Sequence, residues 1–164
     1  MIRVAVDDLA FLPVDAVVRP ADDVLDPVTP GASRLDQLAG GEFVRQRRVQ
    51  VPLGAGAAVV TAAGELPAKF VLHVVIRSPE RATGADTVRR ALTSAWQRAA
   101  DWGLRTVAAP LVGTGPGALE TETAASLLVE TFLQRPADSL ELCIVVETEN
   151  DRRLVEAVIA RSGN

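Results

Sequence analysis

The sequence predicts an α/β protein with a three-layer α/β/α arrangement and a mixed, largely parallel central sheet. The chain has 164 residues, enough for one domain with a substantial core and too few for two ordinary ones. Hydrophobic residues make up 48% of it and aromatic residues only 4%, which is typical of helix and sheet layers packed through small side chains. Strand-like apolar runs alternate with helical patterns in the second half, which favours parallel strands. We therefore expect a single domain spanning residues 1–164.

Two short strands are expected near the start of the chain. Residues 2–6 and 14–18 are rich in valine and alternate or run apolar, which indicates β-structure. The second strand is expected to end at Pro20, because proline has no amide hydrogen to donate to a neighbouring strand.

A loop and a short helix are expected next. Residues 26–31 contain two prolines, which do not fit a helix interior. Residues 32–40 have apolar positions at helical spacing, with Leu38 among the side chains expected to face inward and glycine ending the helix. The pattern over residues 43–52 is mixed and predicts no clear element.

The middle of the chain predicts two strands and a long helix. The strands are expected at residues 57–62 and 69–76, and the second is placed in the centre of the sheet because it is the most continuous apolar run. The helix is expected at residues 86–102. Its apolar positions include Trp96 and Trp102, which are expected to cover the sheet.

A strand, a glycine-rich loop and a helix follow. Residues 106–112 predict a strand buried on both faces, and residues 113–117 interrupt it with three glycines. Apolar residues then recur at helical spacing as far as Phe132, and the acidic residues of the first turn suit the positive end of a helix dipole. A strand at 140–146 and a helix at 151–160 complete the chain.

The glycine-rich loop is a candidate anion site on physical grounds. A strand, a glycine loop and a helix together point several backbone N–H groups at one spot above the carboxyl end of the strand, which suits a phosphate group. Alternatively, the glycines only close a tight turn, because they tolerate positive φ. The loop lacks the Lys-Ser/Thr ending of nucleoside-triphosphate loops and matches no full dinucleotide motif.

The charge balance argues against a general nucleic-acid binder. The formal net charge is -4, whereas binding to a phosphate backbone requires clustered Lys and Arg. The basic cluster of Arg45, Arg47 and Arg48 is expected to be a solvated face.

No metal, cofactor or disulfide is expected. The chain has one His and one Cys, and His73 is expected to be a packed, hydrogen-bonded core residue. Cys143 lies in an apolar run and can form no internal disulfide. The N-terminus has an acidic pair where a secretory signal needs an apolar core, and no apolar run is long enough to span a bilayer. These features predict a cytoplasmic protein.

Four segments, in order, resemble the macro domain, a fold that binds ADP-ribose in many proteins. Asp8-Leu9 and residues 14–18 resemble the family's Gly-Asp-Ile-Thr and Val-Asp-Ala-Ile-Val motifs. Residues 60–75 are similar to its Ile-Thr, Gly, Leu-Pro-Ala and Ile-His-Val pattern, residues 110–115 to its second glycine loop, and residues from 140 onward to its closing strand and helix. The resemblance spans nearly the whole chain and implies a macro-domain-like fold.

The resemblance also implies a ligand site. Asp8 matches the aspartate that reads the adenine amino group, and Leu9 matches its apolar neighbour; a carboxylate accepts readily from an exocyclic amine. The competing interpretation is an aspartate that caps a turn. The residues matching the loop that wraps the diphosphate are Gly113, Thr114 and Gly115, and Pro116 and Gly117 complete the candidate set.

The first ligand loop departs from the family. The family's second strand ends in Asn-x-Ala-Asn, where this chain has Arg19-Pro20-Ala21-Asp22, and Pro27 and Pro30 replace a glycine run. The two prolines remove amide donors and stiffen the loop. Asp22 remains as a candidate for ligand binding and as a candidate general base, and it is expected to pair with Arg19, which would leave it with ordinary acidity.

Three functions are consistent with these features. The first is a binding module for a small-molecule ligand, ADP-ribose or a related nucleotide diphosphate, held by Asp8 and the 113–117 loop. The second is a hydrolase of ADP-ribosyl or phosphoester bonds, with Asp22 as base and Thr114 and Arg19 near the phosphate. The third is a scaffold that keeps the fold without the ligand. The altered first loop favours the first.

Overall fold

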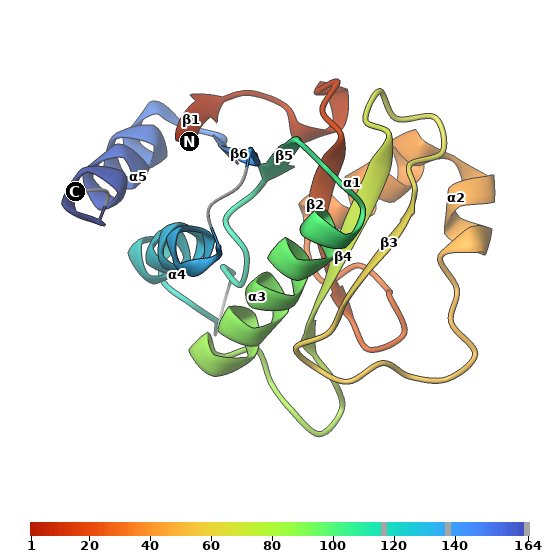
Figure 1. The fold of residues 1–164 in the computed structure, drawn as a ribbon. Coiled ribbons are helices and arrows are strands. Elements are labelled where there is room, and N and C mark those ends of the chain that lie inside the picture. Colours follow the sequence, from red (N-terminus) through yellow and green to blue (C-terminus); the bar gives the residue numbers. More distant parts are fainter. Residues whose placement is uncertain (116–117, 137–138, 163–164) are drawn as a thin grey trace.

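The computed structural model describes residues 1–115, 118–136 and 139–162 and contains a six-stranded sheet (Figure 1). The strands are β1 (Ile2–Val6), β2 (Ala16–Asp22), β3 (Ala58–Ala62), β4 (Phe70–Arg77), β5 (Thr106–Ala109) and β6 (Glu141–Val146). The helices are η1 (Leu9–Phe11), α1 (Pro30–Ala39), α2 (Gly41–Gln46), α3 (Ala85–Asp101), α4 (Thr121–Gln134) and α5 (Glu149–Ser162). The strands are ordered β1-β6-β5-β2-β4-β3, and β3 is antiparallel to β4 while the other neighbouring pairs are parallel. The predicted mixed, largely parallel sheet is confirmed.

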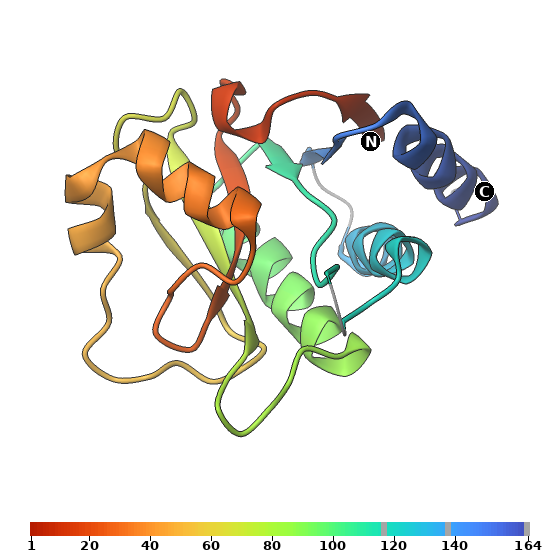
Figure 2. The same cartoon turned by 180° about the vertical axis from the view of Figure 1, so that it is seen from behind.

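Helices cover both faces of the sheet. Helices α3, α4 and α5 pack on one face, and α1 and α2 lie on the other (Figures 1 and 2). The larger core includes Leu92 and Leu128 beneath the three helices, and the smaller includes Leu35 and Phe43. The three layers predicted from the alternating pattern are therefore present. None of the helices in the described parts of the chain has the length and apolar character that a membrane crossing requires.

Strand β2 continues through Pro20 to Asp22, so the prediction that it ends at the proline is wrong. β2 pairs with β4 along its length but with β5 only at Ala16 and Val17. Beyond Val17, one edge of β2 therefore has no partner strand among the described residues. A missing amide hydrogen costs no strand pairing at such an edge.

Helix α1 begins at Pro30, inside the stretch predicted to be a loop. The Thr29 hydroxyl caps the helix by accepting a hydrogen bond from the Ala32 amide at 3.0 Å. Proline fits the first turn because its amide would have no partner within the helix there. Leu38 is 37% exposed, so the prediction that it faces inward is wrong. The short helix α2 was not expected, because six residues carry little periodic signal.

Strand β4 is an interior strand between β2 and the edge strand β3, one place away from the central pair β5 and β2. On α3, Trp96 is buried and its Nε1 donates to Thr131 Oγ1 at 2.9 Å. Trp102 is 54% exposed and packs edge-on against Phe70, with 5.2 Å between the ring centroids. Trp96 therefore packs in the core as expected, whereas Trp102 lies largely at the surface.

Candidate functional site

A cavity of about 820 Å³ opens at the carboxyl ends of four parallel strands. Its wall includes Asp7 after β1, Pro20 near the end of β2, Pro110 after β5 and Glu147 after β6. Ligands of open α/β sheets bind in such crevices, and the volume falls within the usual range of about 300–1,000 Å³ for small-molecule sites. The cavity also lies where the glycine-rich loop leaves β5.

The two ends of the cavity differ in charge. The end beside β1, β6 and the start of α5 is lined by four carboxylates and one guanidinium, namely Asp7, Asp8, Glu147, Asp151 and Arg34. The end beside β2 and β5 is lined by uncharged residues, which include Thr29, Pro30, Gly31, Thr114 and Gly115. Because β1 and β6 form one side of the sheet order and β5 and β2 its centre, the charged and neutral regions lie side by side along the strand ends.

Asp8 lines the charged end and also caps η1. Its Oδ1 accepts hydrogen bonds from the Ala10 amide at 3.1 Å and from Arg34 Nη1 at 2.6 Å. The bond from Arg34, aided by the one from Ala10, holds the pKa of the Asp8 carboxyl below its usual range. Its neighbour Leu9 lines the cavity too. The two interpretations of Asp8, a capping residue and a cavity residue, are therefore compatible.

The glycine loop contributes two described residues, Thr114 and Gly115, to the cavity wall. Gly113 does not line the cavity and has a packing role: its φ is +95°, and an added Cβ would lie 2.9 Å from side chains of Leu119 and Val88. The Leu119 amide donates to the Gly113 carbonyl at 2.9 Å, which closes the loop on itself. Pro116 and Gly117 lie outside the described residues.

Asp22 does not line the cavity. Its Oδ1 accepts hydrogen bonds from the amides of Val24 at 3.0 Å and Asp26 at 2.9 Å, so the carboxylate organises its own loop. Within this loop Leu25 is buried and has a φ of +65°, a conformation that a leucine rarely adopts. The expected ion pair between Asp22 and Arg19 is absent among the described contacts, and that prediction is wrong.

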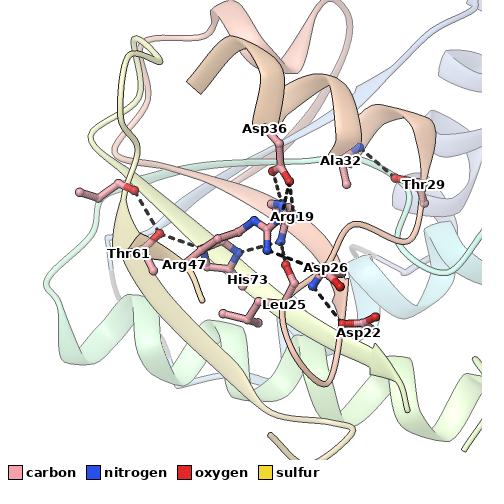
Figure 3. A network of polar contacts seen from close by, with 11 residues as sticks. Arg19, Asp22, Leu25, Asp26, Thr29, Ala32, Asp36, Arg47, Thr61 and His73 are labelled. Atoms are coloured by element: carbon pink, nitrogen blue, oxygen red, sulfur yellow. Dashed lines mark hydrogen bonds and ion pairs between the residues drawn. The ribbon is translucent and has the colours of Figure 1, made fainter. Parts of the chain in front are cut away.

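Arg19 is fully buried and does not line the cavity. It lies in a network of polar contacts with Asp36, Leu25 and His73 (Figure 3). Side chains alternate along a strand, so the cavity-lining Pro20 and its neighbour Arg19 face opposite ways. Arg19 forms a paired contact with Asp36 of α1, Nε to Oδ1 at 2.8 Å and Nη2 to Oδ2 at 2.9 Å, and its Nη1 donates to the Leu25 carbonyl at 2.9 Å. It supports the first loop from beneath and is not positioned to contact a phosphate in the cavity.

Arg47 belongs to the same buried network. Its Nη2 lies 3.0 Å from Asp36 Oδ2 and its Nη1 lies 3.2 Å from Asp26 Oδ1. The prediction of a solvated basic face is therefore wrong for Arg47, which is 6% exposed, although Arg45 and Arg48 are exposed. The network joins β2, α1, the end of α2 and the first loop.

His73 ends the network on β4, as the sequence predicts for a packed and hydrogen-bonded histidine. Arg19 Nη1 lies 3.1 Å from its Nδ1, and its Nε2 lies 2.8 Å from Thr61 Oγ1 (Figure 3). An arginine can only donate, so Nδ1 accepts, and the neutral ring carries its proton on Nε2. Burial, with the charges of Arg19 and Arg47, holds the pKa of His73 well below its usual value.

Arg34 is a cavity residue that sequence reasoning missed. It lies on α1 at helical spacing from Gly31, and both line the cavity. The spacing alone does not identify it, because its position depends on the packing of α1 against η1. Among the described residues, no group of three or more His, Cys, Asp or Glu side chains is arranged to hold a metal ion.

The mixed sheet with a crevice at the carboxyl ends of its parallel strands is the architecture in which open α/β domains bind their ligands. Residues 19–128 match the model of the Macro domain family, so the chain belongs to this family. The assignment made from the sequence motifs is confirmed.

Two relatives of similar length and one longer protein match nearly the whole of this chain. An uncharacterized protein of Aquifex aeolicus is 31% identical, over 95% of this chain and 94% of its own length. A Citrobacter koseri protein named O-acetyl-ADP-ribose deacetylase is 32% identical, over 99% of this chain and 97% of its own. An uncharacterized Mycobacterium tuberculosis protein is 28% identical over 93% of this chain, which spans only 43% of that longer protein.

Solved structures support the fold at lower sequence identity. The Oceanobacillus iheyensis macrodomain with ADP has a TM-score of 0.81 at 16% identity, over 96% of this chain and 89% of that one. The Trypanosoma brucei macrodomain in complex with ADP has a TM-score of 0.83 at 22% identity, over 96% of this chain and 68% of that one.

Proposed function

We propose that this chain is a binding module for ADP-ribose or a smaller adenine nucleotide diphosphate. The observation that carries the proposal is the cavity at the strand ends, with the carboxylate of Asp8 at its charged end and the backbone around Thr114 and Gly115 at its neutral end. A nucleotide has the matching polarity, since its base offers an amine and its diphosphate offers anionic oxygens.

The charged end suits the base. Both described hydrogen bonds to Asp8 use Oδ1, which leaves Oδ2 without a partner among the described residues and available to an exocyclic amine. An aspartate carboxyl is ionised at neutral pH and is then only an acceptor, and the bond from Arg34, which lowers the pKa of Asp8, acts in the same direction. A diphosphate placed here would instead be repelled by the neighbouring carboxylates of Asp7, Glu147 and Asp151.

The neutral end suits the diphosphate. No carboxylate from the described residues lines it, and helix α1 begins there with Pro30 and Gly31 in its first turn. A helix N-terminus carries a partial positive charge, which favours an anion. Pro30 has no amide hydrogen and the Ala32 amide is bonded to Thr29, so the Gly31 amide is the donor of this first turn that an anion could use. Thr114 and Gly115 also line the cavity. The two solved macrodomains described above as ADP complexes agree with a ligand of this class.

Calorimetric titration with ADP-ribose, ADP and AMP tests the proposal. We expect ADP-ribose and ADP to bind and AMP to bind more weakly, because AMP lacks one of the two phosphates that the neutral end would hold. Binding of none of the three would contradict the proposal and favour a scaffold that has kept the fold without the ligand.

A second candidate function is hydrolysis of ADP-ribose derivatives. It is favoured by the Citrobacter koseri relative and by a Citrobacter rodentium relative, 29% identical, that bears the same name, O-acetyl-ADP-ribose deacetylase. The described residues give it weaker support. Asp22 points its Oδ1 at its own loop, and Arg19 lies on the opposite side of β2 from the cavity.

A further inference from the structure

Arg34 and Asp8 face each other across the charged end of the cavity. Arg34 comes from α1 and Asp8 from the turn after β1, 26 residues away along the chain, and their side chains meet at 2.6 Å. The guanidinium carbon of Arg34 also lies 5.6 Å from the centre of the Phe11 ring. Arg34 is therefore held by a carboxylate and an aromatic ring, which reduces the freedom of a long side chain.

We propose that Arg34 is a second base-reading residue, and that Asp8 and Arg34 form an acceptor–donor pair that selects a base carrying an amine beside a ring nitrogen. The inference rests on the proposed function and names the part of the nucleotide that this end of the cavity recognises.

The hydrogen-bonding capacity left over at the pair carries the argument. Arg34 uses one N–H on Asp8 Oδ1, and its remaining N–H groups have no hydrogen-bond partner among the described residues. A guanidinium has five N–H donors in a fixed fork. The pair thus offers one unengaged acceptor, Oδ2 of Asp8, next to several unengaged donors.

Adenine fits this arrangement. Its amine at C6 is flanked by the ring nitrogens N1 and N7, so Asp8 can accept from the amine while Arg34 donates to either nitrogen. A 6-oxopurine in the same position would place a carbonyl oxygen against the carboxylate. The pair would therefore favour ADP and disfavour inosine and guanosine diphosphates.

A plain surface ion pair is the alternative explanation. Both side chains are partly exposed, 48% for Arg34 and 39% for Asp8, and such pairs contribute little to stability. The two explanations differ in their effect on binding. An ion pair without a ligand role predicts that loss of the guanidinium changes no ligand contact, whereas a base-reading pair predicts a loss specific to one ring nitrogen.

The test is a calorimetric titration of the wild type and Arg34→Ala with ADP, 1-deaza-ADP and 7-deaza-ADP. We expect Arg34→Ala to weaken ADP binding about tenfold, as for a hydrogen bond from a charged donor. We expect the same substitution to have little effect on the analogue that lacks the contacted nitrogen. Arg34→Gln retains an N–H donor and should recover part of the loss for ADP. Arg45→Ala, at an exposed arginine of α2 paired with Glu42 outside the cavity, is the matched control.

Two results would overturn the inference while the proposed function stands. One is an equal loss for ADP and both deaza analogues, which would assign Arg34 to a structural or purely electrostatic role. The other is ADP binding in Arg34→Ala that is no weaker than in the wild type: unchanged binding would mean that the guanidinium makes no ligand contact, and tighter binding that the arginine competes for Asp8. Failure of the wild type to bind any nucleotide would overturn the proposed function and this inference together.

Discussion

Arg19 of β2 and Asp36 of α1 form a two-bond ion pair that is buried beneath the first loop, with contacts of 2.8 and 2.9 Å. The same arginine donates to the carbonyl of Leu25, the residue in the left-handed conformation. Asp36 also neutralises Arg47, so one carboxylate serves two buried guanidinium groups. Where the resemblance implies an asparagine, the chain therefore has an arginine that supports the first loop through a buried ion pair and does not line the cavity.

Asp36→Ala should destabilise the fold strongly, because it leaves two buried arginines without their shared carboxylate. We expect a loss of about 3–5 kcal/mol in the free energy of unfolding, measured by urea denaturation. The matched control is Glu42→Ala, which breaks an exposed pair with Arg45 and should change the stability little. Similar midpoints for Asp36→Ala and the wild type would show that the buried network contributes little.

His73 should make the stability depend on pH. Its pKa in the folded chain lies well below that in the unfolded chain, which is near 6.5. As the pH falls below about 6.5, the unfolded chain binds a proton that the folded chain does not, so stability is lost at up to about 1.4 kcal/mol per pH unit until the folded pKa is reached. Urea denaturation between about pH 7.5 and 5.5 measures this slope. His73→Gln should flatten it, and an equally steep slope in that variant would assign the effect to other groups.

The sequence predicted the sheet and most helices because their signals are local. Apolar runs and helical periodicity depend on neighbouring residues, and they located β6 and α3 to within a few residues. Pro20 was misread, because whether a proline fits in a strand depends on the strand beside it. Here β5 ends before it could pair with that part of β2.

The candidate site was predictable in part for the same reason. Asp8 and Thr114 follow strands whose carboxyl ends meet at one edge, and both line the cavity. Arg19 was expected near a phosphate, and Arg47 on a solvated face. Both are instead buried beside Asp36, because a sequence does not show which carboxylate will meet a buried charge. Arg34 gave no signal, since it is defined only by the approach of α1 to Asp8.

Gly115→Glu should abolish nucleotide binding. Gly115 lines the neutral end of the cavity, and no described atom lies within 4 Å of an added Cβ, so the new carboxylate has room to enter the space proposed for the diphosphate. Its φ of +134° will cost any other residue about 1–3 kcal/mol of strain. Gly115→Ala carries the same strain without the charge and is the control. Calorimetry should show binding in the alanine variant and none in the glutamate variant; equal affinities would place the diphosphate elsewhere.

Asp8→Ala should weaken adenine-containing ligands by about 1–3 kcal/mol, the cost of leaving a buried amine without its acceptor. It should also erase any preference for ADP over inosine diphosphate. Glu147→Ala removes another carboxylate of the same cavity, one with no described bond to Asp8, and is the control for general electrostatic effects. Equal losses for the two nucleotides in Asp8→Ala would assign the residue to capping η1 alone.

The last prediction is that turnover of ADP-ribose derivatives is slow or absent. Catalysis requires a group held within reach of the reacting bond, and the candidate base Asp22 is engaged with the amides of Val24 and Asp26 and does not line the cavity. The test is to incubate the protein for hours with O-acetyl-ADP-ribose and with ADP-ribosylated protein. Chromatography measures how much ADP-ribose or acetate is released. Asp22→Asn is a better control than Asp22→Ala, because the amide oxygen can still accept the two loop amides while the base is lost. Turnover well above the uncatalysed rate in the wild type that disappears in Asp22→Asn would make Asp22 catalytic and the chain a hydrolase. Turnover retained in Asp22→Asn would also make the chain a hydrolase, with its catalytic groups elsewhere in the cavity.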